Sequence, residues 1–87
     1  MLTCRYDPPR PVAVETRRGT ALPARLTWRG GPRRVARIEE EWEEVWWGAE
    51  PGEIDRRYYR VQLADGTLCV IYRDGEAGTW FLAGIVD

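Results

Sequence analysis

Two Asp-Gly pairs in the last third of the chain, Asp65-Gly66 and Asp74-Gly75, constrain its fold more than any other feature. Asp-Gly between stretches of alternating apolar and polar residues is a strong β-hairpin signal, because tight hairpin turns need residues with positive φ. A two-residue loop at the first pair and a five-residue loop over 74–78 predict strands at 57–64, 67–73 and 79–86. Because side chains alternate between the faces of a strand, this register places a set of cross-strand pairs on one buried face. The pairs are Leu63–Leu68, Val61–Val70, Tyr59–Tyr72, Tyr72–Trp80 and Val70–Leu82. The sequence therefore predicts a three-stranded antiparallel meander.

Alternation in the first half of the chain predicts three more strands, at 11–17, 22–28 and 33–42. Pro23 suits the start of its strand, because proline cannot donate a hydrogen bond within a sheet. Residues 38–47 also have helical spacing, but we favour a bent strand in which Val35 and Ile38 are out of phase, as a β-bulge would place them. With residues 1–10 as an extended lead-in, residues 11–87 should form one all-β domain. The expected architecture is a small six-stranded, partly open, SH3-like antiparallel barrel.

Charge is distributed unevenly along the chain. Residues 1–37 contain nine arginines and two acids, a net charge of +7, whereas residues 38–55 contain eight acids and no base, a net charge of −8. Residues 56–87 are balanced. Because consecutive strands usually pair, we expect the two charged segments to neutralise each other in an Arg–Glu network. The alternative is that they present separate patches to partners.

The composition argues against catalysis, and we expect a protein that is not an enzyme. The chain has no Lys, His or Ser, so it lacks the nucleophile–base pairs of hydrolases and the lysine of a phosphate-binding loop. Acidic residues are the remaining candidates for an acid pair or a Mg²⁺ site, but such a run is usually a solvated face and lacks the spacing of a cation-binding loop. These acids are Glu39–Glu41, Glu43, Glu44, Glu50, Glu53 and Asp55. We expect no metal and no cofactor.

Cys4 and Cys69 are the only cysteines, too few for a zinc site. They are either two separate thiols, the interpretation that we favour, or a disulfide of a cytosolic thermophile. The absence of Lys, His, Ser and Asn suits a protein from a hot environment, and GC-rich coding would leave the same bias. We see no leader peptide and no apolar stretch long enough to span a membrane, so we expect a cytoplasmic protein.

Aromatic residues are the first candidates for contact with a partner. Trp42 and Trp46 are expected in the core, where large rings stabilise a small domain. Trp47 follows Trp46 directly and has the opposite parity, so at least one of the two should face outward. Trp47 is therefore the best single candidate for a contact residue.

The second face of the predicted meander is the other candidate surface. It carries Ile71 and Phe81 opposite each other, together with Cys69. This apolar pair either docks a partner or is covered by another part of the chain. The nearby Arg57 and Arg60 flank tyrosines, an arrangement that resembles surfaces on which small β-barrels stack bases.

The order of aromatic residues and glycines resembles that of a small bacterial domain family of unknown function. The resemblance covers roughly residues 11–87 and is carried by Trp28-Arg29-Gly30, Val35, Ile38, Trp42, Trp46-Trp47, Arg57-Tyr58-Tyr59-Arg60-Val61, Gly66, Ile71-Tyr72-Arg73-Asp74, Gly78, Trp80, Leu82 and Val86-Asp87. Members of that family occur alone and at the C-terminal end of catalytically inactive Y-family polymerase homologues, the accessory subunits of a bacterial mutasome. The resemblance implies a non-catalytic module that contacts other proteins or DNA.

Taken together, these features predict a non-catalytic module, monomeric or weakly homodimeric, that binds another protein and has a link to DNA damage tolerance. The contact residues would be Trp47, Arg57, Arg60, Ile71 and Phe81. The alternative is a weak single-stranded nucleic-acid-binding domain that uses the arginine-rich segments 17–37 and 56–60 with exposed aromatic rings. The salt dependence of the affinity distinguishes the two functions, because binding through phosphates weakens steeply as the salt concentration rises.

Overall fold

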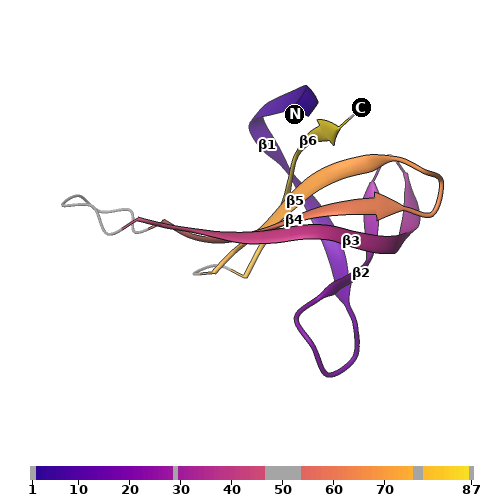
Figure 1. Ribbon diagram of the computed structural model, residues 1–87, viewed down its shortest axis with the longest axis horizontal. Coiled ribbons are helices and arrows are strands. Elements are labelled where there is room, and N and C mark those ends of the chain that lie inside the picture. The colour runs from indigo at the N-terminus through magenta and orange to yellow at the C-terminus, as the bar shows by residue number, and fades with distance from the viewer. Residues whose placement is uncertain (1, 29, 47–53, 76–77, 87) are drawn as a thin grey trace.

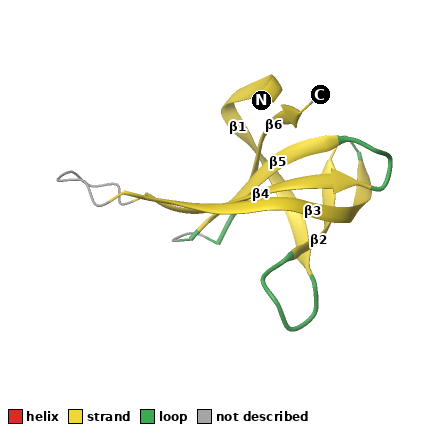
Figure 2. Cartoon of the chain, in the orientation of Figure 1, coloured by secondary structure: helices red, strands yellow, loops and turns green. Residues whose placement is uncertain are grey.

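The computed structural model describes residues 2–28, 30–46, 54–75 and 78–86, which form six β-strands (Figures 1 and 2). The strands are β1 (Leu2–Thr16), β2 (Pro23–Trp28), β3 (Gly31–Trp46), β4 (Ile54–Leu63), β5 (Leu68–Asp74) and β6 (Trp80–Val86). Each strand pairs antiparallel with the next, and β1 also pairs with β6. The predicted all-β fold of six antiparallel strands is confirmed. Across the described residues we find no helix suited to crossing a membrane.

The ring of strands closes through the segment that the sequence analysis treated as a lead-in. Residues 2–10 belong to β1, and this strand pairs with β6 from Leu2↔Val86 to Val12↔Trp80. The second half of the same strand pairs with β2, from Ala13↔Thr27 onward. One long strand therefore borders two neighbours, which closes a ring that we had expected to be partly open.

The hairpin between β4 and β5 has a three-residue loop where the sequence predicted two residues. Gly66 N donates a hydrogen bond to Leu63 O (2.9 Å), and Leu63 N donates to Thr67 O (2.8 Å). Gly66 has φ of +91°, so the loop is a tight turn closed by a left-handed glycine, a common hairpin connection. The extra loop residue shifts the register by one position, and Tyr59 pairs with Ile71 in place of Tyr72.

The register shift turns β5 over, and this corrects the predicted faces. Cys69 and Ile71 lie in the core with 0% of their surface exposed. Val70 and Tyr72 are also buried, but they lie on the outer face of the sheet, where they pair with Arg60 and Tyr58 of β4. Alternation failed to set the phase here because the run from Leu68 to Tyr72 is apolar on both faces of β5, so neither register buries a polar residue of this run.

The hairpin between β5 and β6 is also shifted by one position. Asp74 N donates to Thr79 O (2.8 Å), and the pairs that follow are Arg73↔Trp80, Tyr72↔Phe81 and Ile71↔Leu82. The ladder then shifts between Ile71↔Leu82 and Val70↔Gly84, which leaves Ala83 as an extra residue of β6. As predicted, Trp80 and Leu82 face the core, whereas Phe81 lies on the outer face.

The core lies inside the ring and is built mainly from β4, β5 and β6. Its buried cluster consists of Leu26, Tyr59, Val61, Leu63, Cys69, Ile71, Trp80 and Leu82. Tyr59 and Trp80 pack ring against ring, with centroids 5.6 Å apart. Val35 and Ile38 of β3 pack against this cluster from the side.

Two irregularities bend β3 and decide which way Trp42 points. The register with β4 shifts between Val35 and Arg37 and again between Ile38 and Glu40. The strand alternative with a bulge is confirmed over the helical one. Because of the second shift, Trp42 falls on the opposite face from Ile38, and 38% of its surface is exposed. The expectation that Trp42 lies in the core is therefore wrong.

Ion pairs neutralise the acidic segment mostly from β4 and not from the basic N-terminal segment. Arg56 lies 3.7 Å from Glu44, and Arg57 contacts both Glu41 (3.3 Å) and Glu43. Among the described ion pairs, only Arg37–Glu39 (2.5 Å) joins residues 1–37 to residues 38–55. The expected network between these two segments is corrected accordingly: β4 is the neighbour that β3 pairs with along its acidic half.

The two cysteines are separate thiols. Cys4 is exposed on β1 and Cys69 is buried on β5. Both are cross-strand neighbours of Ile85 on β6, so one strand lies between them and a disulfide cannot bridge that spacing. Burial raises the pKa of the Cys69 thiol to about 12, which keeps it protonated.

Candidate functional site

A row of four aromatic side chains crosses the outer face of the sheet from β3 to β6. Each is the direct cross-strand partner of the next: Trp42↔Tyr58, Tyr58↔Tyr72 and Tyr72↔Phe81. Their ring centroids are 5.3, 4.9 and 5.2 Å apart, and the Trp42 and Tyr58 planes are parallel to within 4°. Directly opposed side chains on adjacent strands lie close enough to stack, so the register itself builds this row. We call these four residues the aromatic row.

Charged and small residues flank the aromatic row on both sides. Toward the β3–β4 hairpin lies Arg56, whose guanidinium is 4.9 Å from the centre of the Tyr72 ring and pairs with Glu44. On the other side, the register aligns Glu40 with Arg60 and Arg60 with Val70. Val70 pairs in turn with Gly84 on β6, and Gly84 pairs with Arg5 on β1.

The first part of β1 forms a wall at the far side of this face. Between the pairs Arg5↔Gly84 and Arg10↔Leu82, β1 has four residues where β6 has only Ala83. These extra residues leave the ladder, and Tyr6 packs under the guanidinium of Arg10, 4.6 Å from its ring centre. The small residues Ala83 and Gly84 opposite this bulge leave the face hollow.

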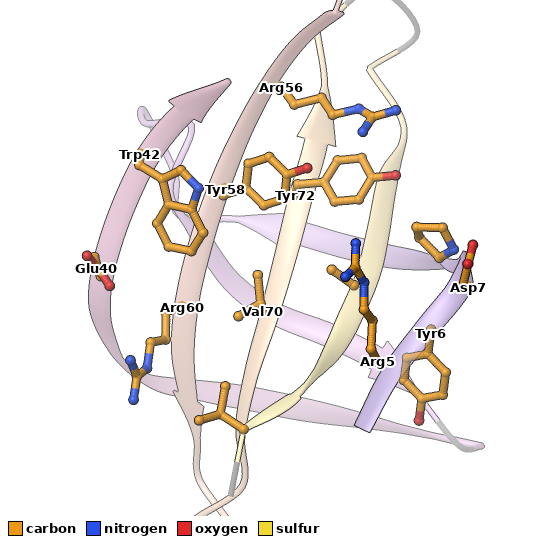
Figure 3. A pocket seen from close by; sticks show the side chains of 13 residues that line it. Arg5, Tyr6, Asp7, Glu40, Trp42, Arg56, Tyr58, Arg60, Val70 and Tyr72 are labelled. Carbon is orange, nitrogen blue, oxygen red and sulfur yellow. The ribbon is translucent and has the colours of Figure 1, made fainter. Parts of the chain in front are cut away.

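The result is a groove of about 510 Å³ whose floor is the sheet and whose wall is β1 (Figure 3). Its lining residues are Arg5, Tyr6, Asp7, Pro9, Glu40, Trp42, Arg56, Tyr58, Arg60, Val70, Tyr72, Ala83 and Val86. Figure 3 shows Trp42 and Glu40 at the β3 end, the two tyrosines in the middle, and Arg5, Tyr6 and Asp7 at the β1 end. A groove of this size with an apolar floor and a few polar groups is typical of a binding site.

The polar groups of the groove are well suited to hydrogen bonding. Tyr58 OH donates to Glu44 (3.1 Å), and burial raises the pKa of both Tyr58 and Tyr72, so both phenols stay protonated. The Nε of Arg60 is buried and has no hydrogen-bond acceptor among the described protein groups. A buried donor without a partner is costly, at about 1–3 kcal/mol, so an acceptor supplied by a ligand would stabilise this side chain.

The structure brings some of the predicted contact residues into this groove and not others. Arg60 lines the groove, and Phe81 ends the aromatic row. Ile71 lies in the core and is closed to partners in the folded chain, a consequence of the shifted register. Arg57 points to the other face of β4, where it holds Glu41 and Glu43. Trp47 lies outside the described residues.

Sequence reasoning missed Trp42, Tyr58 and Tyr72 as residues of the outer face and of the groove. Tyr72 was placed in the core by the two-residue loop, and Trp42 by the assumption that no second bulge follows Ile38. The available signal was the aromatic spacing itself, because a three-residue loop at Asp65-Gly66 makes Tyr58 and Tyr72 direct partners.

A second, smaller depression of about 220 Å³ lies on the other face of β4 and is lined by Ala21, Asp55, Arg57, Tyr59, Arg73 and Gly75. Both Glu41 and Glu43 neutralise Arg57 there. Within the described residues, no cluster of three or more acidic or cysteine side chains could hold a metal ion.

The family of the chain follows from comparison with known proteins. A domain of unknown function, DUF6504, matches residues 5–87, and the chain belongs to this family. The match includes most of β1, the strand that closes the ring and forms the wall of the groove. Comparison with curated proteins and with solved structures finds no match.

Proposed function

We propose that the protein is a non-catalytic interaction module that binds an extended segment of another protein in the groove. The aromatic row is the observation that carries this proposal. Stacked rings on a rigid sheet offer a preorganised contact surface that binds with little loss of conformational entropy, and aromatic residues and arginine are enriched where proteins bind each other. The unpartnered Nε of Arg60 suits a carbonyl oxygen of a peptide backbone.

The charges in the groove favour a protein segment over a nucleic acid. Glu40 and Asp7 line the groove beside its arginines, and Glu44 already neutralises Arg56. A nucleic acid carries a phosphate at every step and would meet these carboxylates along its path. A peptide can place donors and cations opposite the acids and acceptors opposite Arg5 and Arg60.

Single-stranded nucleic acid is the second candidate. Trp42 and Tyr58 resemble a platform on which bases stack, and Arg5 and Arg60 would contact phosphates at one side of the row. Under this alternative, the affinity would fall steeply with salt, because phosphate contacts release counterions.

The process served is part of the same proposal. The sequence resembles a family that occurs at the end of inactive Y-family polymerase homologues, and a peptide-binding module would join such proteins to their partners. We therefore propose that the protein serves as an accessory contact in DNA damage tolerance.

Two probes test the proposal: a library of random peptides displayed on phage and selected against the immobilised full chain, and an oligothymidylate of about twelve nucleotides. Each enriched peptide, and the oligonucleotide, is titrated into the chain while amide and indole NMR shifts are followed. We expect peptide-induced shifts at Trp42, Tyr58, Tyr72 and Arg60. Affinity should change little between about 50 and 200 mM salt, a range over which several phosphate contacts would cost orders of magnitude.

Trp42→Ala should weaken peptide binding by about tenfold or more, as loss of an aromatic anchor does. Trp28→Ala is the matched control, because it removes the same side chain from β2, away from the groove. Circular dichroism verifies that both variants are folded. Steeply salt-dependent binding of the oligonucleotide with no enriched peptide would replace the proposal by the second candidate, and binding of neither probe would refute both.

A further inference from the structure

None of the described strands pairs with one edge of β3 over most of the length of that strand. β3 pairs with β2 through Gly31–Arg34 only, and its later residues pair with β4 on the other side. No described strand pairs with the remaining edge of Arg37–Trp46, and Figure 1 shows this part of β3 running out of the ring beside β4. Every second residue of an antiparallel strand directs its N–H and C=O away from its partner, so this edge presents a row of backbone groups to a further strand.

The open edge carries an excess of negative charge. Its acids are Glu39, Glu40, Glu41, Glu43 and Glu44. Glu39 pairs with Arg37 and Glu44 with Arg56, a single arginine, Arg57, serves both Glu41 and Glu43, and no ion pair is found for Glu40 among the described residues. Five acids therefore face three arginines, and the remaining negative charge favours a strand that supplies positive charge.

Trp42 gives the edge a specific contact point. Its ring stacks on Tyr58 through one face, at the β3 end of the aromatic row, and it is the one exposed large apolar side chain of the described residues. A strand added beside β3 at its open edge would therefore place a side chain against the other face of the Trp42 ring. Glu40 and Glu44 stand two residues to either side of Trp42, about 7 Å away along the same face.

We infer that an extended, arginine-containing segment of the partner pairs with the open edge of β3 as an additional strand. One arginine would continue the aromatic row by stacking on Trp42, where its guanidinium lies between Glu40 and Glu44. Arginine fits better than lysine because its planar group stacks on rings and binds carboxylates through several N–H donors. The inference deepens the proposed function, on which it rests, by naming the chemistry and the binding mode of the part of the partner that extends past the β3 end of the groove, where Glu40 and Trp42 line it.

A second copy of the chain is a poorer occupant of this edge. Pairing of two β3 strands would place their glutamates side by side, and like charges in directly opposed positions destabilise a strand pair. The charge on the edge thus selects against self-association while it attracts a basic strand.

The test uses a capped peptide of nine residues, enough to cover most of the open edge at about 3.3 Å per residue. Arginine stands at its centre and threonine and valine alternate on either side. Three versions are compared with it: citrulline at the centre, which keeps the shape and removes the charge; lysine at the centre; and alternate N-methylated amides, which remove strand hydrogen bonds. Affinities are measured by calorimetry on the full chain, and contacts by NMR shifts of β3 amides.

We expect the arginine peptide to bind about tenfold more tightly than the citrulline peptide, and lysine to fall between them. N-methylation on the amides that face β3 should abolish binding. Glu40→Gln and Trp42→Leu should each reduce the preference for arginine over citrulline. Glu15→Gln is the matched control, because Glu15 is exposed on β1 and pairs with Arg25 away from the groove.

The outcomes separate this inference from the proposed function. If peptides enriched from the random library bind in the groove but tolerate citrulline and N-methylation, the inference is overturned and the proposed function stands. If the β3 amides respond to chain concentration and not to the peptide, the edge serves self-association and the inference is wrong. If only the oligonucleotide binds, both the inference and the proposed function are wrong.

Discussion

Ile71 tests the register on which the candidate site depends. This side chain is 0% exposed in the core, whereas a two-residue loop at Asp65-Gly66 would have turned it outward. Ile71→Ala removes three carbon groups, worth about 2.4 kcal/mol at about 0.8 kcal/mol each. A residual cavity of about 50 Å³ adds about 1.2 kcal/mol, at about 24 cal/mol per Å³. The expected loss of unfolding free energy is therefore about 3–4 kcal/mol.

Urea unfolding followed by tryptophan fluorescence measures this loss. If the free energy of unfolding falls by about 1 kcal/mol per M urea, the urea concentration at the unfolding midpoint should fall by about 3 M. This is a large part of the total stability expected for a domain of this size. Ile71→Val removes one carbon group and should cost about 0.5–1.5 kcal/mol, which gives a graded series at one position. A cost below about 0.5 kcal/mol for the alanine variant would match an exposed residue and refute the register, and the aromatic row with it.

Two further predictions concern the turn and the buried thiol. Gly66→Ala should lose about 1–2 kcal/mol in the same urea assay, because φ is +91° and the cost is conformational: an added Cβ meets nothing within 4 Å. Gly31→Ala has equal space without positive φ and should change stability by less than about 0.5 kcal/mol; equal losses in the two variants would contradict the turn geometry. Burial raises the pKa of Cys69 to about 12, so its stabilising contribution is complete below the pKa of the unfolded thiol, about 8.5, and is lost as pH rises toward 12. Stability of Cys69→Ala should therefore decline less over that range, and a thiol reagent should label only Cys4 in the native chain and both cysteines in denaturant.

The sequence predicted the strands well because turns and alternation are local signals. Five of the six predicted strands coincide closely with the observed ones, and alternation correctly assigned the faces of β4 and of β6 from Trp80 to Leu82. Beyond Leu82 the extra residue Ala83 reverses the faces of β6, so Ile85 packs against the core where alternation had placed it on the outer face. The face of β5 was wrong because its run from Leu68 to Tyr72 is apolar throughout, and only the loop length decides its phase. With a two-residue loop Ile71 would lie on the outer face as a contact residue, and with the observed three-residue loop it lies in the core.

The candidate site was harder to predict because it depends on register across four strands. The aromatic row exists only when both hairpin loops and the second irregularity of β3 all have their observed lengths. Arg60 and Phe81 were identified because they belong to the outer face in either register. The wall of the groove was missed because residues 1–10 give no alternating pattern, and their place beside β6 is a long-range pairing.

Ring closure by β1 and β6 has a consequence for synthesis of the chain. Leu2 pairs with Val86, so β1 leaves the ribosome well before β6 and gains this partner only when β6 has been made. Until then the edge of β1 that pairs with β6 stays open, and the groove is incomplete. Contacts between such distant positions slow folding, so binding competence should appear only after translation of this segment is complete.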